Sequence, residues 1–296
     1  MRLRIVLSSG ILLCAGMLAA CGSGAASPPA APPSMEFTNP QRVSILGYSG
    51  DAMEPFISPD GQVLFFNNLN SPAVDTNLHY ATRVDALTFQ YQGEVAGANS
   101  TALDGVASMD TSSRFYFIST RSYASTASTV HRGNWSAGTL SGLELVGGIS
   151  AAAPGLLVFD AGISPDGNTL CFAEGDYSTG NLTTANLVLA DRTATGFTRS
   201  AQSATLLQQV NLAGGTQFAP ALSASGLELF FTRLQGGTPA IFTASRASTA
   251  SPFGPPHVIQ ALSGFVEAPS LSTDGKSLYY HAYIGGQYGI YRATRP

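Results

Sequence analysis

The sequence carries little charge and almost no lysine. Charged side chains make up 11% of the 296 residues, Lys276 is the single lysine, and the formal net charge is −4. A protein that binds nucleic acid or an anionic lipid surface needs clustered basic side chains to neutralise phosphates. The composition therefore excludes nucleic acid as a partner.

Cysteine is scarce as well, with only Cys14, Cys21 and Cys171 in the whole chain. The first two fall in the N-terminal stretch, so Cys171 stands alone in the rest of the sequence and has no disulfide partner there. It lies within an apolar run, where an unpaired thiol packs as a small hydrophobic side chain.

The usual catalytic and metal-binding motifs are missing too. No C-x-x-C, H-E-x-x-H or G-x-S-x-G pattern occurs, and no glycine loop of the phosphate-binding type is present. The four histidines are scattered without ligand spacing, at positions 79, 131, 257 and 281. We therefore expect no cofactor.

No hydrophobic run is long enough for a comfortable transmembrane helix. Arg2 and Arg4 precede an apolar stretch over residues 5–20, which has the shape of a secretory signal. It ends in Leu18-Ala19-Ala20-Cys21, which resembles the lipobox of bacterial lipoproteins, and this resemblance implies cleavage before Cys21 and lipid on that cysteine. An ordinary secretory signal with an incidental cysteine is the alternative.

Three segments follow from this pattern. Residues 1–20 are predicted to be a lipoprotein signal peptide, and residues 21–35 a flexible linker of alanine, proline and serine. Residues 36–296 are predicted to form one folded domain. We expect an outer-membrane lipoprotein of the bacterial envelope, facing the periplasm or the cell surface and held to the membrane through Cys21.

One phrase of sequence occurs five times along the predicted domain. In each copy an apolar residue precedes a serine, a polar turn follows, and an apolar strand ends in an aromatic residue. Proline, aspartate and glycine in these turns favour a tight hairpin. The copies are EPFISPDGQVLFFN (54–67), DGVASMDTSSRFYFIS (104–119), DAGISPDGNTLCFA (160–173), APALSASGLELFFT (219–232) and APSLSTDGKSLYYH (268–281).

Each hairpin is followed by further strand-like segments. The strand-final aromatics Phe66, Phe117, Phe172, Phe231 and Tyr280 are predicted to be core residues. Third strands are expected over 77–83, 129–135, 186–192, 240–246 and 289–295, and weaker fourth strands at 94–97, 143–148, 205–210 and 257–264. Four strands per repeat, repeated around a circle, is the pattern of a β-propeller, so we predict an all-β, five-bladed propeller.

The last repeat has no fourth strand after it, because the chain stops behind its third strand. The missing strand is predicted at the other end, since residues 37–46 (FTNPQRVSIL) parallel residues 253–262 (FGPPHVIQAL). The N-terminal segment should therefore complete the C-terminal blade and close the ring.

These hairpins and the Y-A-T-R third strand resemble the TolB-type, WD-like β-propeller repeat of bacterial envelope proteins. The resemblance covers about residues 37–296 and is specific for the fold rather than for a function. TolB itself has six blades and an additional N-terminal domain, so the partners of TolB do not carry over.

Acidic side chains mark three of the five repeats. The residue four before each aligned serine is Glu54, Asp104 or Asp160 in the first three copies and alanine in the last two. This position is predicted to begin the innermost strand, so the three carboxylates should surround one mouth of the central channel. Five-bladed glycoside hydrolases resemble this arrangement. The acids can therefore be catalytic, hold a cation such as Ca²⁺, or be structural caps.

The leading hypothesis is a non-catalytic module that binds an envelope protein or a glycan. The predicted loops at 68–75, 121–129 and 175–184 should line one face, with Tyr123 and Tyr177 as contact residues. The alternative is a polysaccharide-active enzyme, a glycoside hydrolase or lyase, that uses Glu54, Asp104 and Asp160.

Overall fold

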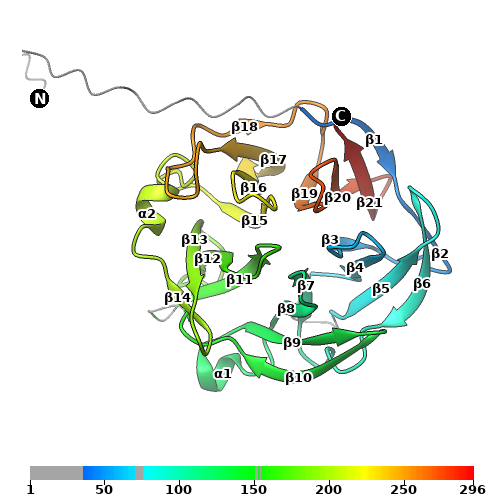
Figure 1. Ribbon diagram of the computed structural model, residues 1–296, viewed down its shortest axis with the longest axis horizontal. Helices are drawn as coiled ribbons and strands as arrows, with labels where there is room; N and C mark the ends of the chain where they lie inside the picture. The colour runs from blue at the N-terminus through cyan, green and yellow to red at the C-terminus, as the bar shows by residue number, and fades with distance from the viewer. Residues whose placement is uncertain (1–35, 71–75, 151–152, 154) are drawn as a thin grey trace, which may run out of the picture.

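The computed structural model describes residues 36–70, 76–150, 153 and 155–296. The predicted signal peptide, Cys21, the linker up to residue 35 and part of the loop at 68–75 lie outside the described residues. Five small antiparallel sheets stand side by side around a central axis, as Figure 1 shows. The all-β, five-bladed propeller predicted from the repeats is thus confirmed.

Each blade contains three long strands, and these match the predicted hairpin and third strand. The inner strands are β3 (Met53–Ile57), β7 (Asp104–Met109), β11 (Leu156–Ile163), β15 (Gln217–Leu222) and β19 (Val266–Leu271). The second strands are β4 (Val63–Asn67), β8 (Arg114–Ser119), β12 (Thr169–Asp176), β16 (Glu228–Gln235) and β20 (Ser277–Ile284). The third strands are β5 (Leu78–Arg83), β9 (Val130–Ser136), β13 (Thr184–Arg192), β17 (Thr238–Ser245) and β21 (Gln287–Thr294).

The outer strands depart most from the sequence prediction. They are β6 (Thr88–Glu94), β10 (Thr139–Leu145), β14 (Phe197–Arg199) and β18 (His257–Val258). The strand predicted at 205–210 is wrong, because the chain there forms the short helix α2 (Ser203–Leu206) and a following turn. Leu206, Leu207 and Val210 are buried at helical spacing, and this burial replaces strand pairing.

The N-terminal segment closes the ring as predicted, and it contacts both blades at the seam. Strand β1 (Thr38–Arg42) pairs antiparallel with β21 as the outermost strand of the fifth blade. Strand β2 (Ser44–Leu46) then pairs parallel with β6 and adds a fifth strand to the first blade. Figure 1 shows this blue segment lying beside the red C-terminal strand.

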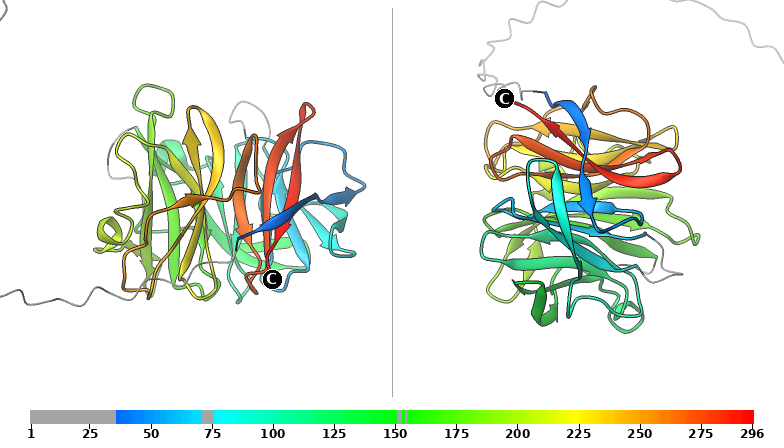
Figure 2. Two further views of the ribbon diagram at one scale, coloured as in Figure 1. Left: turned by 90° about the horizontal axis from the view of Figure 1, so that it is seen from above. Right: turned by 90° about the vertical axis from the view of Figure 1, so that its right-hand side faces the viewer.

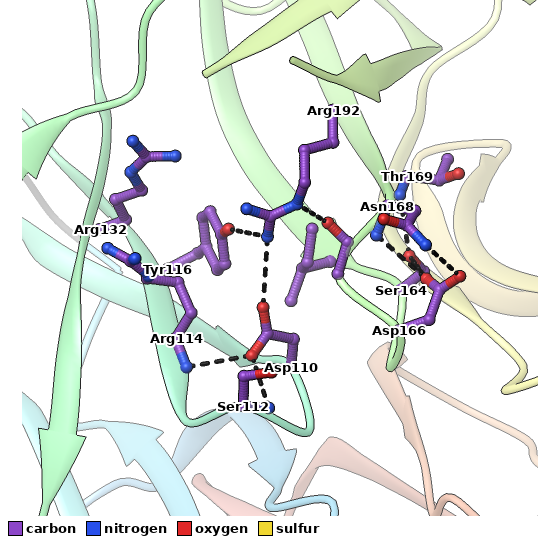
Figure 3. A network of polar contacts seen from close by, with 12 residues as sticks. Asp110, Ser112, Arg114, Tyr116, Arg132, Ser164, Asp166, Asn168, Thr169 and Arg192 are labelled. Carbon is purple, nitrogen blue, oxygen red and sulfur yellow. Dashed lines mark hydrogen bonds and ion pairs between the residues drawn. The ribbon is translucent and has the colours of Figure 1, made fainter. Parts of the chain in front are cut away.

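In four of the five blades an arginine at the end of the third strand donates to the carbonyl of the turn glycine, and in three of these it also reaches the preceding blade. In the third blade Arg192 donates through Nε to the carbonyl of the turn glycine Gly167, and through Nη2 to the Tyr116 hydroxyl of the second blade at 3.0 Å (Figure 3). Arg83 and Arg295 make the same two connections, reaching Tyr279 and Glu228 of the preceding blade. Each of these three guanidinium groups also lies over a phenylalanine in the outer strand or directly before it, at 4.6 Å for Arg83 on Phe89 and 4.7 Å for Arg295 on Phe37.

The second blade has no arginine at this position, and a tryptophan makes the contact with the preceding blade instead. Trp135 occupies the equivalent position, as its backbone N–H donates to Ser113 just as that of Arg83 donates to Gln62. Its ring packs edge-on against Phe65 of the first blade, with 4.7 Å between centroids. Apolar contact therefore replaces the charged connection at this interface.

Two short helices interrupt the β structure, α1 (Tyr123–Thr126) and α2. Among the described residues, no helix has the length and apolar character needed to cross a membrane.

Ring closure leads to a stability prediction at Phe37, which is 2% exposed and packs edge-on against Phe230 at 5.7 Å. Phe37→Ala is expected to lower the free energy of unfolding by about 3–5 kcal/mol, because a large buried ring is lost and a cavity remains. Urea unfolding measures this change. Leu46→Ala in the same segment is the control, because Leu46 is 46% exposed and should change stability little. Equal effects for the two variants would contradict the proposed closure.

Candidate functional site

The five inner strands all begin on one face of the ring, which we call the loop face. The opposite face, which carries the S-P-D-G turns, is the turn face. The hairpins β12–β13, β16–β17 and β20–β21 rise on the loop face in the left-hand view of Figure 2. The acidic side chains singled out in the sequence lie near the start of inner strands and therefore belong to this face.

Four inner strands kink where they begin. Glu54, Val106, Ala219 and Ala268 have positive φ angles between 48° and 58°, and each lies in a break of the pairing with the second strand. Such a β-bulge leaves its backbone N–H without a partner in the strand ladder. A buried N–H needs an acceptor, so each bulge has to obtain one from elsewhere.

The preceding blade supplies that acceptor in every case. The amide of Glu54 donates to Nδ1 of His281 at 3.1 Å, and that of Val106 donates to Oδ1 of Asn67 at 3.2 Å. The amide of Ala268 donates to the hydroxyl of Thr232 at 3.0 Å. Asn67, Thr232 and His281 each follow the aligned core aromatic of their own second strand, so one position per blade serves the next blade.

Asp160 has a specific role in this ring of contacts. In the third blade the position after the aromatic is Ala173, which offers no acceptor, and Asp160 pairs opposite Ala173 across the two strands. The Asp160 carboxylate accepts the amide of Ala219 at 3.1 Å instead. Asp160 is therefore an inter-blade connector, and it is 4% exposed.

Glu54 belongs to a buried group with His281 and Glu267. Its carboxylate accepts a hydrogen bond from the Asn70 side chain at 2.7 Å, and its backbone N–H donates one to Nδ1 of His281. The proton of His281 is thereby assigned to Nε2, which donates to Glu267 at 2.9 Å. The neutral imidazole is fully buried, while Glu54 and Glu267 are 7% and 9% exposed.

Burial and mutual repulsion shift the pKa values of this group. Burial raises the pKa of Glu54 to about 7, and the Glu267 charge adds to the rise while the hydrogen bond from Asn70 opposes it. Burial also raises the pKa of Asp160 well above its ordinary value, with the charges of Glu54 and Glu267 acting in the same direction. Glu54, Asp160 and Glu267 thus interact electrostatically, although they come from three different blades.

Asp104 does not belong to this group, which corrects the predicted triad. The turn of the second blade is one residue shorter, and Asp110 takes the place of Ser58 by pairing its N–H with the strand that follows. Val106, four residues before Asp110, therefore occupies the place of Glu54. The Asp104 carboxylate is fully buried and accepts from Ser100 and from Arg121, so its charge is neutralised in its own blade.

The central channel is narrow. Residues of all five inner strands line it, from Glu54, Val106 and Ala219 near the loop face to Pro59 and Pro165 at the turn face. Its cavity volume is about 60 Å³, room for a few water molecules. Binding pockets for small molecules have volumes of roughly 300–1,000 Å³, so a sugar ring cannot enter this channel.

Among the described residues, one group of side chains has donor atoms close enough together to be considered as a metal site. Donor atoms of Glu54, Glu267 and His281 all lie within 4.8 Å of one another. Ca²⁺ prefers about six to eight oxygen ligands, and a histidine whose Nδ1 is already bonded offers none. This group therefore does not fit Ca²⁺. Of the three acids considered for that ion, Asp104 is bonded to Arg121 and Asp160 to the amide of Ala219.

A partly exposed cluster of aromatic side chains lies beside this buried group on the loop face. Tyr283 is 47% exposed and packs on Tyr288 at 4.8 Å, while Phe265 lies 5.6 Å from Tyr288. Tyr288 in turn contacts His281, with 5.6 Å between ring centroids. The neighbouring residue Ile284, at the tip of the hairpin, is 58% exposed.

The two tyrosines predicted as contact residues also lie in loop-face connections. Tyr123 is half-buried and begins α1, whose residues are otherwise exposed. Tyr177 packs edge-on against Phe159 at 6.0 Å, and burial raises its pKa to about 12. Tyr177 is therefore held against its own blade more firmly than a free contact residue.

The sequence pattern does not single out Glu267, and it shows His281 only as one of four histidines without ligand spacing. Their pairing runs between opposite residues of β19 and β20, and no linear motif records it. One sequence feature does mark the kinks, because Glu54, Ala219 and Ala268 are each followed by proline. Aligning the repeats on this proline places Glu267 one residue before the kink of the fifth blade.

No protein-family model and no curated protein match this sequence. Among solved structures, an endo-arabinase from Bacteroides thetaiotaomicron is similar, with a TM-score of 0.56, 15% identity, and 86% of this chain and 98% of that chain covered. Zg3597, a family 117 glycoside hydrolase produced by Zobellia galactanivorans, is similar with a TM-score of 0.54 and 12% identity. The match covers 88% of this chain and 90% of that chain. TolB from Acinetobacter baumannii has a TM-score of 0.44 and 14% identity. The match covers 83% of this chain and 55% of the length of TolB. Identities this low establish the shared propeller fold and nothing more.

The raised pKa of Glu54 leads to a prediction about pH. An acid whose pKa is higher in the folded state stabilises the fold fully below its ordinary value of 4.5, and this contribution is lost as pH rises towards about 7. Glu54→Gln keeps the shape and cannot ionise. It should be more stable than the wild type at pH 8, on the order of 2 kcal/mol, with little difference at pH 4.5. Urea unfolding at both pH values tests this, and a difference independent of pH would contradict it.

Asp104 leads to the opposite expectation, namely a structural role. Asp104→Asn leaves Arg121 without its partner in a buried site, which should lower the free energy of unfolding by about 3 kcal/mol. Asp191→Asn is the control, because Asp191 is exposed and should change stability by less than about 0.5 kcal/mol. Thermal and urea unfolding measure both variants, and an unchanged stability of Asp104→Asn would show that the ion pair contributes nothing.

Proposed function

We propose that this protein is a lipid-anchored β-propeller of the bacterial envelope that binds a protein or a glycan on its loop face without catalysing a reaction. The observation that carries the proposal is the cluster of exposed Tyr283 with half-buried Tyr288 and Phe265, which lies against His281 of the buried group. Tyrosine presents a large, rigid, partly apolar surface with a polar end, which suits contacts with sugars and proteins alike.

Two features favour binding over catalysis. The acids expected to act on a substrate are at most 9% exposed, and the channel beside them is too small for a sugar ring. Asp160 and Asp104 are moreover engaged, the first with the amide of Ala219 and the second with Arg121. Carboxylates fixed in this way stabilise the ring rather than react.

The loop face also has an uneven outline that suits a partner. In the fourth and fifth blades the second and third strands are joined by tight turns at Gly236-Gly237 and Gly285-Gly286, whereas the connections in the first three blades are longer. Both hairpins carry exposed apolar residues near their tips, Leu234 at 37% and Tyr283 at 47%. Two neighbouring hairpins of similar design therefore present exposed apolar side chains on the same face.

An enzyme acting on polysaccharide is the second candidate, and one observation favours it. A carboxyl group with a pKa of about 7 is suited to donate a proton near neutral pH, and Glu54 has other carboxylates as neighbours. In this alternative Glu54 is the acid and Glu267 or Asp160 the second carboxylate.

The test compares Tyr283→Ala with Glu54→Gln, using the mature protein on a glycan array and on immobilised envelope proteins. A binding module should lose at least about tenfold in affinity in Tyr283→Ala, since central aromatic contacts contribute about 1–2 kcal/mol or more, and should bind normally in Glu54→Gln. Val84→Ala is the control, because Val84 is 60% exposed and follows the end of β5 on the turn face, away from the proposed contact region.

An enzyme should instead release new reducing or unsaturated sugar ends, and Glu54→Gln should abolish that release. Full binding by Tyr283→Ala together with loss of turnover in Glu54→Gln would overturn the binding proposal.

A further inference from the structure

Three blades place an arginine over the same core position. Arg121 lies over Phe117, Arg199 over Phe172 and Arg233 over Phe231, with 5.5, 5.2 and 5.2 Å from the guanidinium carbon to the ring centre. These three phenylalanines are the aligned aromatics of the second, third and fourth blades. The arginines come from different parts of their blades, namely a loop, the outer strand β14 and the second strand β16.

The three guanidinium groups share a second contact. Each donates through Nη2 to a carbonyl of the segment that leads into its blade, which is Ala98 for Arg121, Ile149 for Arg199 and Val210 for Arg233. The environment is therefore equivalent in all three blades, with an aromatic face below and a backbone carbonyl at one edge.

A third contact separates Arg233 from the other two. Arg121 forms an ion pair with Asp104, and Arg199 forms one with Glu174. Within the described part of the chain, Arg233 has no carboxylate partner. Arg233 is nevertheless only 8% exposed, and its Nε is buried without a hydrogen-bond acceptor.

The residue that could have supplied a carboxylate is neutral. Gln217 holds the position in the fourth blade that Asp104 holds in the second, two residues before the kink of the inner strand. Gln217 lies opposite Arg233 in the strand pairing, and Asp104 lies opposite Ser119. Its amide is committed elsewhere, donating to the carbonyl of Ala185 at 2.9 Å and accepting from the N–H of Leu212 at 3.1 Å. A buried cation without a partner is costly, since leaving one charged group unpaired costs several kcal/mol.

We infer that Arg233 is a binding site for a carboxylate group supplied by a ligand, in the place that Asp104 and Glu174 occupy in the neighbouring blades. The planar guanidinium can receive two carboxylate oxygens side by side, through the free Nε and one Nη. The aromatic faces of Phe231 and Phe242, with 5.2 and 4.7 Å to their centres, hold the group in a fixed orientation. Burial also lowers the pKa of Arg233, as expected for a cation that lacks a counter-charge.

The segment over residues 211–215 gives a route to this site. It begins directly after Val210, which accepts from Arg233, and ends before Thr216, whose carbonyl accepts from Leu234 at 3.1 Å. Residues 212–214 are exposed, and a side chain added at Gly214 would meet no atom within 4 Å. The loop therefore flanks Arg233 and lies between its guanidinium group and solvent. The inference does not depend on the proposed function, because an enzyme and a binding module could both use such a site.

The test measures binding of sodium acetate and sodium glucuronate to the mature protein, with sodium chloride at equal ionic strength as reference. Acetate should raise the melting temperature of the wild type by about 2 °C or more at saturation and broaden the NMR signal of ¹³C-acetate. Arg233→Met should abolish both effects. Arg233→Lys keeps the charge but loses the two-point geometry, so it should weaken binding at least about fivefold.

Arg199→Met is the matched control, because its guanidinium already has Glu174 and should not bind acetate. This variant should be less stable but should respond to acetate as the wild type does. Equal responses in the wild type and Arg233→Met, or no response in the wild type, would overturn the inference. A response to glucuronate at lower concentration than to acetate would identify a sugar acid as the preferred source of the carboxylate, and the reverse order would identify a small free acid.

Discussion

The backbone kink at the start of four inner strands is the constraint on which the centre of this propeller depends. Each kink turns one N–H away from its own strand ladder and obliges the preceding blade to offer an acceptor. The identities of several central side chains follow from this need. His281, Asn67 and Thr232 differ chemically, yet they perform the same task, and Asp160 performs it where Ala173 cannot.

The architecture could be predicted from sequence because its determinants are local. Turn chemistry, alternating burial and the likeness of residues 37–46 to 253–262 gave the five blades and the closing strand. The site was only half predictable. The shorter turn at Asp110 displaced Asp104 from the alignment by two residues, and no spacing rule identifies this without the strand pairing. The ion pair that neutralises Asp104 and the contact between His281 and Glu267 join residues on different strands, so they too needed three-dimensional structure.

Charge is distributed very differently on the two faces of the ring. On the turn face, arginines donate to glycine carbonyls of their own blade and to tyrosine hydroxyls or Glu228 of the preceding blade, so these cations have acceptors. On the loop face, buried carboxylates are grouped around a neutral histidine and one arginine lacks an acid. The loop face also holds the ion pairs of Asp104 with Arg121 and of Glu174 with Arg199, so the contrast between the two faces lies in Arg233 and in the carboxylates around His281.

The strand that closes the ring is also the first strand of the folded chain. Any tension applied to the N-terminal stretch therefore reaches the domain at β1, whose pairing with β21 is interrupted between Thr38 and Gln41. Strand β2, paired with β6 in the first blade, resists separately, so β1 would peel away while the first blade kept its added strand. A force on the N-terminal end would therefore act first on the pairing of β1 with β21, where the ring closes. The fifth blade would lose its outer strand while the other blades stayed intact.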